Sequence, residues 1–244
     1  MDTHGKDFAS IYDDRRRRRG EKAWPMLAAI ARGECPHGQR WLDLCCGGGW
    51  LLQHVCSAGY EGVGLDACEH QLHHARRNAP KARFVHADVR GFDLGRAFDV
   101  VTCLCDSLNH LTVKRDFVRA VRAAKRHLAP GGRFVFDVAA LEHLLARPHH
   151  TRSIHEPHRV LIVRSDCDAK RALRRVRITG FVLHGRLWRR FEEVHVQRGY
   201  RPEEVEDMLA RCGLAWRKLD GDTFGRVKKS SRRLLYVCRQ AVSS

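Results

Sequence analysis

The segment Asp43-Leu-Cys45-Cys46-Gly47-Gly48-Gly49 combines an acidic residue with a glycine-rich turn. Glycine lets a backbone bend tightly and lets a ligand approach it closely, so this turn between a strand and a helix is typical of a nucleotide-binding crossover. The pattern lacks the Gly-x-Gly-x-x-Gly spacing that lays a pyrophosphate on a helix N-terminus. Asp43 suits a cationic amino group instead. The segment therefore favours an amino-acid-bearing cofactor over a nicotinamide.

Two further acids, Asp66 and Asp88, follow short apolar segments in the same half of the chain. The carboxyl ends of parallel strands border one crevice, so the three acids are expected around the same site. His110 follows the apolar segment 98–104, and an imidazole can accept a proton near neutral pH. No Cys-x-x-Cys pair occurs, and neither His73-His74 nor His149-His150 has ligand spacing, so we expect no metal site.

The elements that must position these residues alternate between strand and helix from Arg40 to Val138. Short apolar segments predict strands and the amphipathic segments between them predict helices, which indicates a parallel sheet with helices on both faces. Strands are expected at 41–44, 62–65, 82–85, 98–104 and 133–138, and helices at 50–58, 69–78 and 115–128.

After about residue 150, apolar residues alternate with charged ones, which predicts antiparallel strands with one solvated face. Three strands with a hairpin at His184-Gly185 are expected, then a helix and two closing strands, at 159–164, 172–183, 187–197, 202–212, 214–219 and 233–239. The expected organisation is a helical arm or cap at 1–39, a core at 40–148 and 198–244, and an antiparallel flap at 149–197.

The N-terminal region contains five consecutive arginines, Arg15 to Arg19, followed by an apolar segment that predicts a helix over 24–32. Such a run is usually a solvated helix face, and it could also grip phosphates. The sequence leaves open whether the run touches a ligand.

Taken in order, the segments between residues 41 and 138 resemble the motifs of the class I S-adenosylmethionine (SAM) methyltransferases. Asp43, Cys46, Gly47 and Gly49 match the first motif, whereas Cys45 stands where glycine is common. The later motifs resemble Gly64–Asp66, Phe84–Val89, Phe98–Leu104 and Leu128–Phe136. The resemblance implies an α/β fold: a doubly wound, Rossmann-like, seven-stranded, mostly parallel sheet with the flap inserted after strand five.

The same resemblance implies SAM as the cofactor and S-adenosylhomocysteine as its product. Asp43 would bind the cofactor's amino group, Asp66 its ribose hydroxyls and Asp88 its adenine amino group. The remaining cofactor contacts would come from residues beside these acids and after the fourth strand, namely Cys45, Cys46, Gly47, Gly49, Ala67, Ala87, Val89, Leu104 and Cys105.

Longer segments resemble a small-molecule subgroup that includes glycine N-methyltransferase-like enzymes and amino-sugar N-methyltransferases. The matching segments are Phe8–Asp13, Cys105–Leu111 and Phe191–Tyr200. The resemblance implies His110, His195 and Tyr12 as catalytic candidates, and Asp106, Asn109, Glu193 and Arg198 as substrate contacts.

Each of these side chains also has a structural alternative. Asp106 or Asn109 could cap the helix after the fourth strand. Glu193 and His195, two residues apart on one strand face, could form a buried polar pair. His110 could pack over the cofactor or bond a backbone carbonyl.

The charge is strongly positive, with 45 Lys and Arg against 28 Asp and Glu, a formal net charge of +17. A positive field attracts anions such as nucleic acids or nucleotide-linked metabolites, although the arginine excess can also reflect coding bias. A nucleic-acid methyltransferase is therefore the alternative, but no Asp/Asn-Pro-Pro-aromatic motif, Pro-Cys dipeptide or separate RNA-binding module occurs. A non-catalytic protein of this fold is disfavoured because all three acids are retained.

We therefore expect a SAM-dependent methyltransferase that acts on an amine or hydroxyl of a small molecule, an anionic one being an option and N-methylation being favoured. No apolar run of about 18 residues and no signal pattern occurs, so we expect a cytoplasmic protein without membrane contact. A homodimer is compatible with the sequence. The ten cysteines are expected to be reduced.

Overall fold

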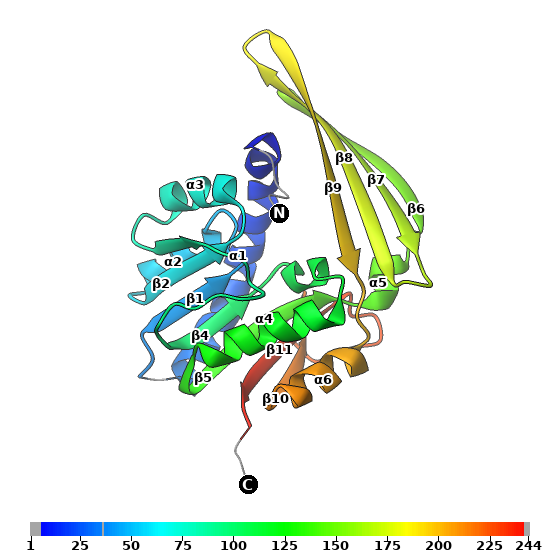
Figure 1. Ribbon diagram of the computed structural model, residues 1–244. Helices are drawn as coiled ribbons and strands as arrows, with labels where there is room; N and C mark the ends of the chain where they lie inside the picture. Colours follow the sequence, from blue (N-terminus) through cyan, green and yellow to red (C-terminus); the bar gives the residue numbers. More distant parts are fainter. Residues whose placement is uncertain (1–5, 36, 242–244) are drawn as a thin grey trace.

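The computed structural model describes the backbone of residues 6–35 and 37–241 and the side chains of residues 17–35 and 37–241. Its strands form two sheets (Figure 1). One has seven strands in the order β10-β11-β5-β4-β1-β2-β3, and the other has four strands in the order β6-β7-β8-β9. The smaller sheet follows β5 in the chain and stands away from the larger one.

The seven-stranded sheet is mostly parallel, as expected. Its β11 runs antiparallel to both β5 and β10, whereas the other neighbouring strands are parallel. The strands are β1 (Arg40–Leu44), β2 (Glu61–Asp66), β3 (Arg83–His86), β4 (Phe98–Cys103), β5 (Leu128–Ala139), β10 (Leu214–Asp220) and β11 (Arg233–Gln240).

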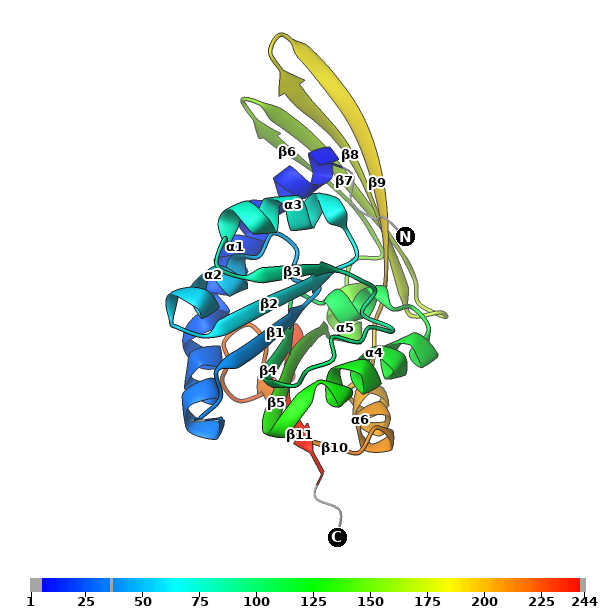
Figure 2. The same ribbon diagram turned by 60° about the vertical axis from the view of Figure 1, so that its left-hand side comes forward.

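Helices cover both faces of this sheet (Figure 2). On one face, Trp41 of β1 packs in a cluster with α1 and α2, whereas its neighbour Leu42 packs on the other face with α4 and α6. Because successive strand residues point to opposite faces, a strand buried on both sides is apolar throughout, which explains the short apolar segments of the sequence. The helices are α1 (Lys6–Glu34), α2 (Trp50–Ser57), α3 (Glu69–Asn78), α4 (Lys114–Arg126) and α6 (Pro202–Arg211).

The described residues of the N-terminal region form one helix, α1, which is longer than the helix expected over 24–32. Helix α1 continues through Pro25, although proline removes one backbone donor and disfavours a helix interior. Ala23, Leu27 and Ala31 lie four residues apart and are buried against the sheet, and this packing stabilises the helix across the proline. In the described part of the chain, no helix is long and apolar enough to cross a membrane.

The four-stranded sheet is antiparallel, and we call it the flap. It consists of β6 (His149–Glu156), β7 (Arg159–Asp168), β8 (Leu173–His184) and β9 (Leu187–Arg198). The hairpin between β8 and β9 lies at the expected position. Strand β6 was not expected, because Ile154 is its only aliphatic residue, and it contains His149-His150. The short helices α5 (Leu141–Leu145) and η1 (Ser107–His110) complete the chain.

One face of the flap looks toward the core. Its buried residues Leu161, Val163 and Ile178 form a small apolar cluster with Phe191. The strand register places Glu193 beside Ile178 and His195 beside Val176, so Phe191, Glu193 and His195 share this inner face, as their alternation predicted. The rings of His195 and His110, which lies in η1, are 6.0 Å apart. The inner face of the flap therefore meets the core at η1.

Candidate active site

The glycine-rich turn after β1 has an unusual backbone. Gly47 (φ 52°), Gly49 (φ 76°) and also Cys45 (φ 55°) lie in the left-handed region, which side chains other than glycine disfavour. This explains why glycine is common at the position of Cys45. At Gly49 an added Cβ would lie 3.0 Å from the Cβ of Ala75 in α3, so this glycine lets α3 pack directly on the turn.

Asp43 is held in place by a threonine from the neighbouring strand. The hydroxyl of Thr102 donates to Asp43 Oδ1 over 2.7 Å, and the Trp41 indole N–H donates to Thr102 Oγ1 over 3.0 Å. The residues Asp43 and Thr102 are paired directly in the β1–β4 register. The buried carboxylate therefore has a fixed direction at the carboxyl end of β1.

Asp66 and Asp88 lie at the ends of the next two strands, but their carboxylates have different partners. Asp66 accepts backbone N–H donors from Gly47 (2.8 Å) and Cys68 (2.9 Å). Asp88 is bound by Arg90, whose backbone N–H (2.8 Å) and Nε (2.9 Å) both donate to Asp88 Oδ1. The hydrogen bond from the Arg90 side chain lowers the pKa of Asp88. Arg90 was not expected at this site.

A hollow opens beside the glycine turn. Residues from both sides of the turn, from α1 and from the end of β4 line it: Arg19, Gly20, Asp43, Cys45, Cys46, Trp50, Leu51, Leu104 and Cys105. Five of these were predicted as cofactor contacts. The other predicted positions, namely Gly47, Gly49, Asp66, Ala67, Ala87, Asp88 and Val89, lie along the same edge of the sheet, in or after β2 and β3 and in the turn after β1.

Arg19, a residue of helix α1, lines this hollow. Its Nη2 donates to Asp137 Oδ2 over 2.9 Å and its Nη1 donates to Asp222 Oδ1 over 3.0 Å. Its Nε is buried and has no hydrogen-bond partner among the described residues. Buried donors without a partner are uncommon in folded proteins. Of the arginine run, Arg19 thus turns inward, whereas Arg18 is exposed.

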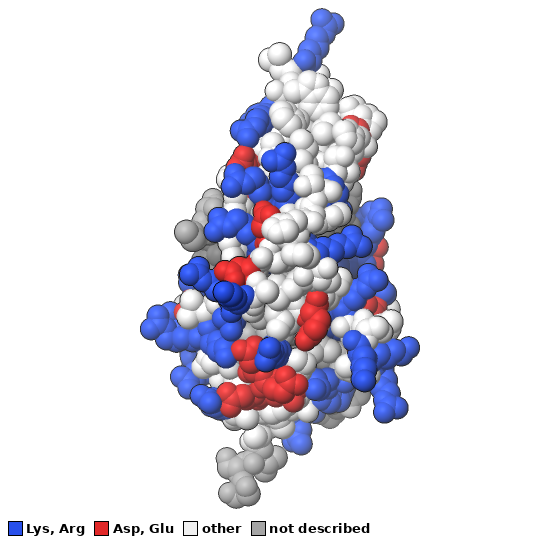
Figure 3. All heavy atoms as spheres, turned by 90° about the vertical axis from the view of Figure 1, so that its right-hand side faces the viewer, with Lys and Arg blue, Asp and Glu red and all other residues white. Residues whose placement is uncertain are grey.

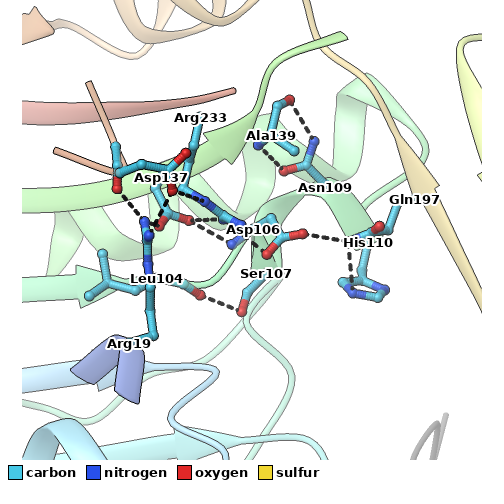
Figure 4. A network of polar contacts seen from close by, with 12 residues as sticks. Arg19, Leu104, Asp106, Ser107, Asn109, His110, Asp137, Ala139, Gln197 and Arg233 are labelled. Carbon is cyan, nitrogen blue, oxygen red and sulfur yellow. Dashed lines mark hydrogen bonds and ion pairs between the residues drawn. The ribbon is translucent and has the colours of Figure 1, made fainter. Parts of the chain in front are cut away.

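A buried ionic network lies next to this arginine (Figure 4). Asp137 of β5 is fully buried, and its Oδ1 accepts from the backbone N–H of Asp106 (2.6 Å) and from Arg233 Nη1 (3.0 Å). Arg233 Nη1 also donates to Asp106 Oδ1 over 2.9 Å. Burial opposes the charge of Arg233, but Asp137 and Asp106 outweigh it and raise its pKa.

The network reaches the inner face of the flap through Gln197. Its Nε2 donates to Asp106 Oδ2 over 2.8 Å and lies 3.5 Å from His110 Nε2 (Figure 4). Asp106 occupies the position before η1, but its side chain makes no capping hydrogen bond. The structure thus brings together three of the predicted acceptor-side residues, Asp106, His110 and His195.

The remaining predicted acceptor-side residues have other surroundings. Asn109 is buried inside η1, where it accepts from the Ala139 N–H (2.9 Å) and donates to the Arg198 carbonyl (2.8 Å); it joins two backbone segments and caps no helix. The Arg198 guanidinium lies over the Tyr200 ring at 5.3 Å and beside Glu204. Glu193 lies on the inner face of the flap. Tyr12 belongs to α1, but its side chain lies outside the described residues.

Among the described residues, no group of three or more His, Cys, Asp or Glu side chains is placed to hold a metal ion. All ten cysteines are free thiols.

Comparison with known proteins places this site in context. Residues 42–132 match the methyltransferase domain family. The chain is 29% identical to a putative methyltransferase, YqeM, of Bacillus subtilis, over 96% of each chain. It is 26% identical to the dTDP-3-amino-3,4,6-trideoxy-alpha-D-glucopyranose N,N-dimethyltransferase of Streptomyces venezuelae, over 91% of this chain and 90% of that one.

The fold comparison agrees. A SAM-dependent methyltransferase from Clostridium acetobutylicum superimposes with a TM-score of 0.84 at 23% identity, over 97% of this chain and 98% of that one. The chain is a SAM-dependent methyltransferase. Its cofactor is SAM.

The residues of this methyltransferase suit that cofactor. SAM carries an α-amino and an α-carboxylate group on its methionine part, and the residues that line the hollow include the acidic Asp43 and the basic Arg19. The sequence patterns located Asp43 but not its support from Thr102, which only the strand register reveals. They also left the arginine run without a role, because the inward turn of Arg19 depends on Asp137 and Asp222, far along the chain.

Proposed function

We propose that this methyltransferase transfers a methyl group to the amine of a small molecule, an amino sugar being the favoured class. The observation that carries the proposal is the acceptor side: an ionised Asp106 and two histidines, His110 and His195, meet where the flap contacts η1, in the segment that follows Cys105 of the hollow. Carboxylate and imidazole groups are suited to hold an amine and to accept its proton. The sugar class is supported by the relative from Streptomyces venezuelae, which matches over nearly the whole chain.

On the cofactor side, we assign the amino group to Asp43 and the carboxylate to Arg19. Asp66 takes the ribose hydroxyls, and Asp88 with Arg90 takes the adenine edge. The remaining contacts to the cofactor come from Cys45, Cys46, Gly47, Gly49, Ala67, Ala87, Val89, Leu104 and Cys105. When bound, SAM supplies an electrophilic methyl group on a positively charged sulfur.

On the acceptor side, the chain's main work is to hold the amine in line with that methyl group, since proximity and orientation can lower the barrier by several kcal/mol. His110 accepts the proton that the amine loses, and His195 and Glu193 line the opposite wall on the flap. We propose residues 1–39 as a cap, from which Tyr12 closes the site, and residues 149–197 as the flap over the acceptor. Asn109 and Arg198 position the base of the flap.

The charge of the molecule supports an anionic acceptor. Lys and Arg side chains lie in groups on both sides of an uncharged strip on one face, and acidic side chains gather toward the lower part of this face (Figure 3). A positive field raises the local concentration of anionic ligands. On this face the basic side chains form no continuous stripe, which favours a small anion over a nucleic-acid strand.

The test is a screen of acceptors with methyl-labelled SAM. Nucleotide-linked amino sugars, free amino sugars, their hydroxyl analogues and an RNA oligomer are compared at equal concentration. The proposal expects label in the amino sugars and none in the hydroxyl analogues. Label in the hydroxyl analogues alone would overturn N-methylation, and label in RNA with binding that falls steeply with salt would favour the nucleic-acid alternative.

A further inference from the structure

The side-chain amide of Gln197 lies between two residues of the segment that follows β4. Its Nε2 is 2.8 Å from Asp106 Oδ2 and 3.5 Å from His110 Nε2. Gln197 comes from strand β9, 87 residues away from His110 in the chain. The contact is therefore a tertiary arrangement between the flap and η1 (Figure 4).

Asp106 determines which way this amide faces. Burial opposes ionisation of Asp106, but the charge of Arg233, 2.9 Å away, outweighs it and lowers the pKa of the carboxyl. An ionised carboxylate only accepts hydrogen bonds, so Gln197 must present its NH₂ group to it. The backbone N–H of Asp106 is bonded to the buried Asp137, and its Oδ1 accepts from Arg233, so both the backbone and the carboxylate of Asp106 are held.

The fixed amide in turn determines the state of His110. An amide nitrogen carries two hydrogens and accepts none, so the ring nitrogen that faces it must be an acceptor. His110 Nε2 is that nitrogen, and in a neutral imidazole the single hydrogen then lies on Nδ1. A hydrogen on Nε2 would point at the NH₂ group of Gln197. Rotating the amide to relieve this would turn its oxygen toward the carboxylate of Asp106.

We propose that Gln197 is a positioning residue, which holds His110 as the Nδ1–H tautomer with the lone pair of Nε2 directed toward the flap. An acceptor amine replaces the 3.5 Å contact between Gln197 Nε2 and His110 Nε2, whereas the 2.8 Å contact between Gln197 and Asp106 remains. This second step rests on the proposed function, whereas the tautomer does not. Among the described residues, the groups that face His110 include Asp106 from its own segment and His195 and Gln197 from β9.

Nitrogen NMR of the whole chain with bound S-adenosylhomocysteine tests the tautomer without any acceptor. The chain is labelled with ¹⁵N-histidine, and the His110 signals are assigned by their loss in His110→Gln. We expect a protonated Nδ1 and an unprotonated Nε2 at a pH where the ring is neutral. In Gln197→Leu, which keeps the volume and removes the amide, the ratio of Nδ1–H to Nε2–H forms should fall by about fivefold, the effect of one ordinary hydrogen bond.

Two further variants separate positioning from general damage. Asp106→Asn frees the amide to rotate and should shift the tautomer ratio in the same direction. Gln53→Leu changes an exposed glutamine on α2 and should leave the ratio unchanged. An Nε2–H tautomer in the unaltered protein, or an unchanged ratio in both Gln197→Leu and Asp106→Asn, would overturn the proposal. If the acceptor screen fails, the NMR result on the His110 tautomer is unaffected. Only the proposal that an acceptor amine replaces Gln197 at His110 would be lost.

Discussion

The carboxylate of Asp66 and the backbone amide of Gly47 are joined by a 2.8 Å hydrogen bond, which ties the end of β2 to the turn after β1. The second oxygen of Asp66 accepts from the Cys68 amide, 2.9 Å away. A carboxylate has about four lone-pair sites, so two backbone donors leave capacity for two hydroxyl groups. The two backbone bonds fix the direction in which that capacity points.

Asp66→Ala should therefore weaken the binding of S-adenosylhomocysteine strongly. Hydrogen bonds to a charged group contribute about 1.5–3 kcal/mol, so the dissociation constant should rise by about 10–100-fold. His110→Ala, on the acceptor side, should change it by less than about threefold, well under 1 kcal/mol. Titration calorimetry measures both. Equal losses would show that the division between cofactor and acceptor residues is wrong.

Thr102 supports the neighbouring acid, and its hydroxyl is the group to remove. Thr102→Val keeps the shape of the side chain but leaves the buried Asp43 carboxylate without its 2.7 Å donor. We expect S-adenosylhomocysteine to bind about 5–10-fold more weakly, the effect of roughly one buried hydrogen bond. Thr102→Ser keeps the hydroxyl and should bind within about twofold of the unaltered chain. An equal loss in both variants would instead point to packing.

The cofactor edge of the fold could be predicted because its information is local. Asp43, Asp66 and Asp88 each lie at or just after the carboxyl end of a short strand, and parallel strands bring these ends together whatever else the chain does. The alternation of residues along the strand around His195 is also local, and it predicted that His195 shares one face of the flap with Phe191 and Glu193. Strand β6 was missed because Ile154 alone marks its apolar face.

The network between the two sides could not be predicted, because its members are far apart in the sequence. Asp137 reads as one polar residue within an apolar strand, and its partners Arg19 and Arg233 lie 118 and 96 residues away. Arginine is abundant in this chain, so no pattern distinguishes these two. Only the packing of α1 and β11 beside β5 brings their guanidinium groups to a buried carboxylate.

Asp220, at the end of β10, should make stability depend on acid pH. Burial opposes its ionisation, but hydrogen bonds from Ser231 and from the amides of Thr223 and Asp222 outweigh it and lower the pKa to about 2. The unfolded chain has a value near 3.9, so the stabilisation is complete above about pH 4 and is lost as the pH falls through about 2.

Urea unfolding of Asp220→Asn measures this contribution. The variant should be less stable than the unaltered chain by about 1–2 kcal/mol at pH 7, and the difference should shrink toward pH 2.5. Asp207→Asn, an exposed carboxylate on α6, serves as the control and should show little difference at either pH. A gap for Asp220→Asn that stays constant between the two pH values would contradict the assignment.

Arg19 should distinguish cofactors that carry a carboxylate from those that lack one. Its Nε is a buried donor without a partner among the described residues, and Arg19 lines the same hollow as Asp43. S-adenosylhomocysteine has the α-carboxylate, whereas 5′-methylthioadenosine has the same nucleoside and no amino-acid group. Arg19→Gln should weaken the former by about tenfold or more, as expected for a charge-assisted hydrogen bond, and the latter by less than about twofold.

The two ligands in one variant separate recognition from structural damage. Arg19 also binds Asp137 and Asp222, so its loss could loosen α1, but a loosened hollow would weaken both ligands alike. Arg18→Gln, in the adjacent exposed position, is the matched control and should leave both affinities unchanged. If Arg19→Gln lowers both affinities by the same factor, Arg19 acts through the ionic network, and the carboxylate of the cofactor is bound elsewhere.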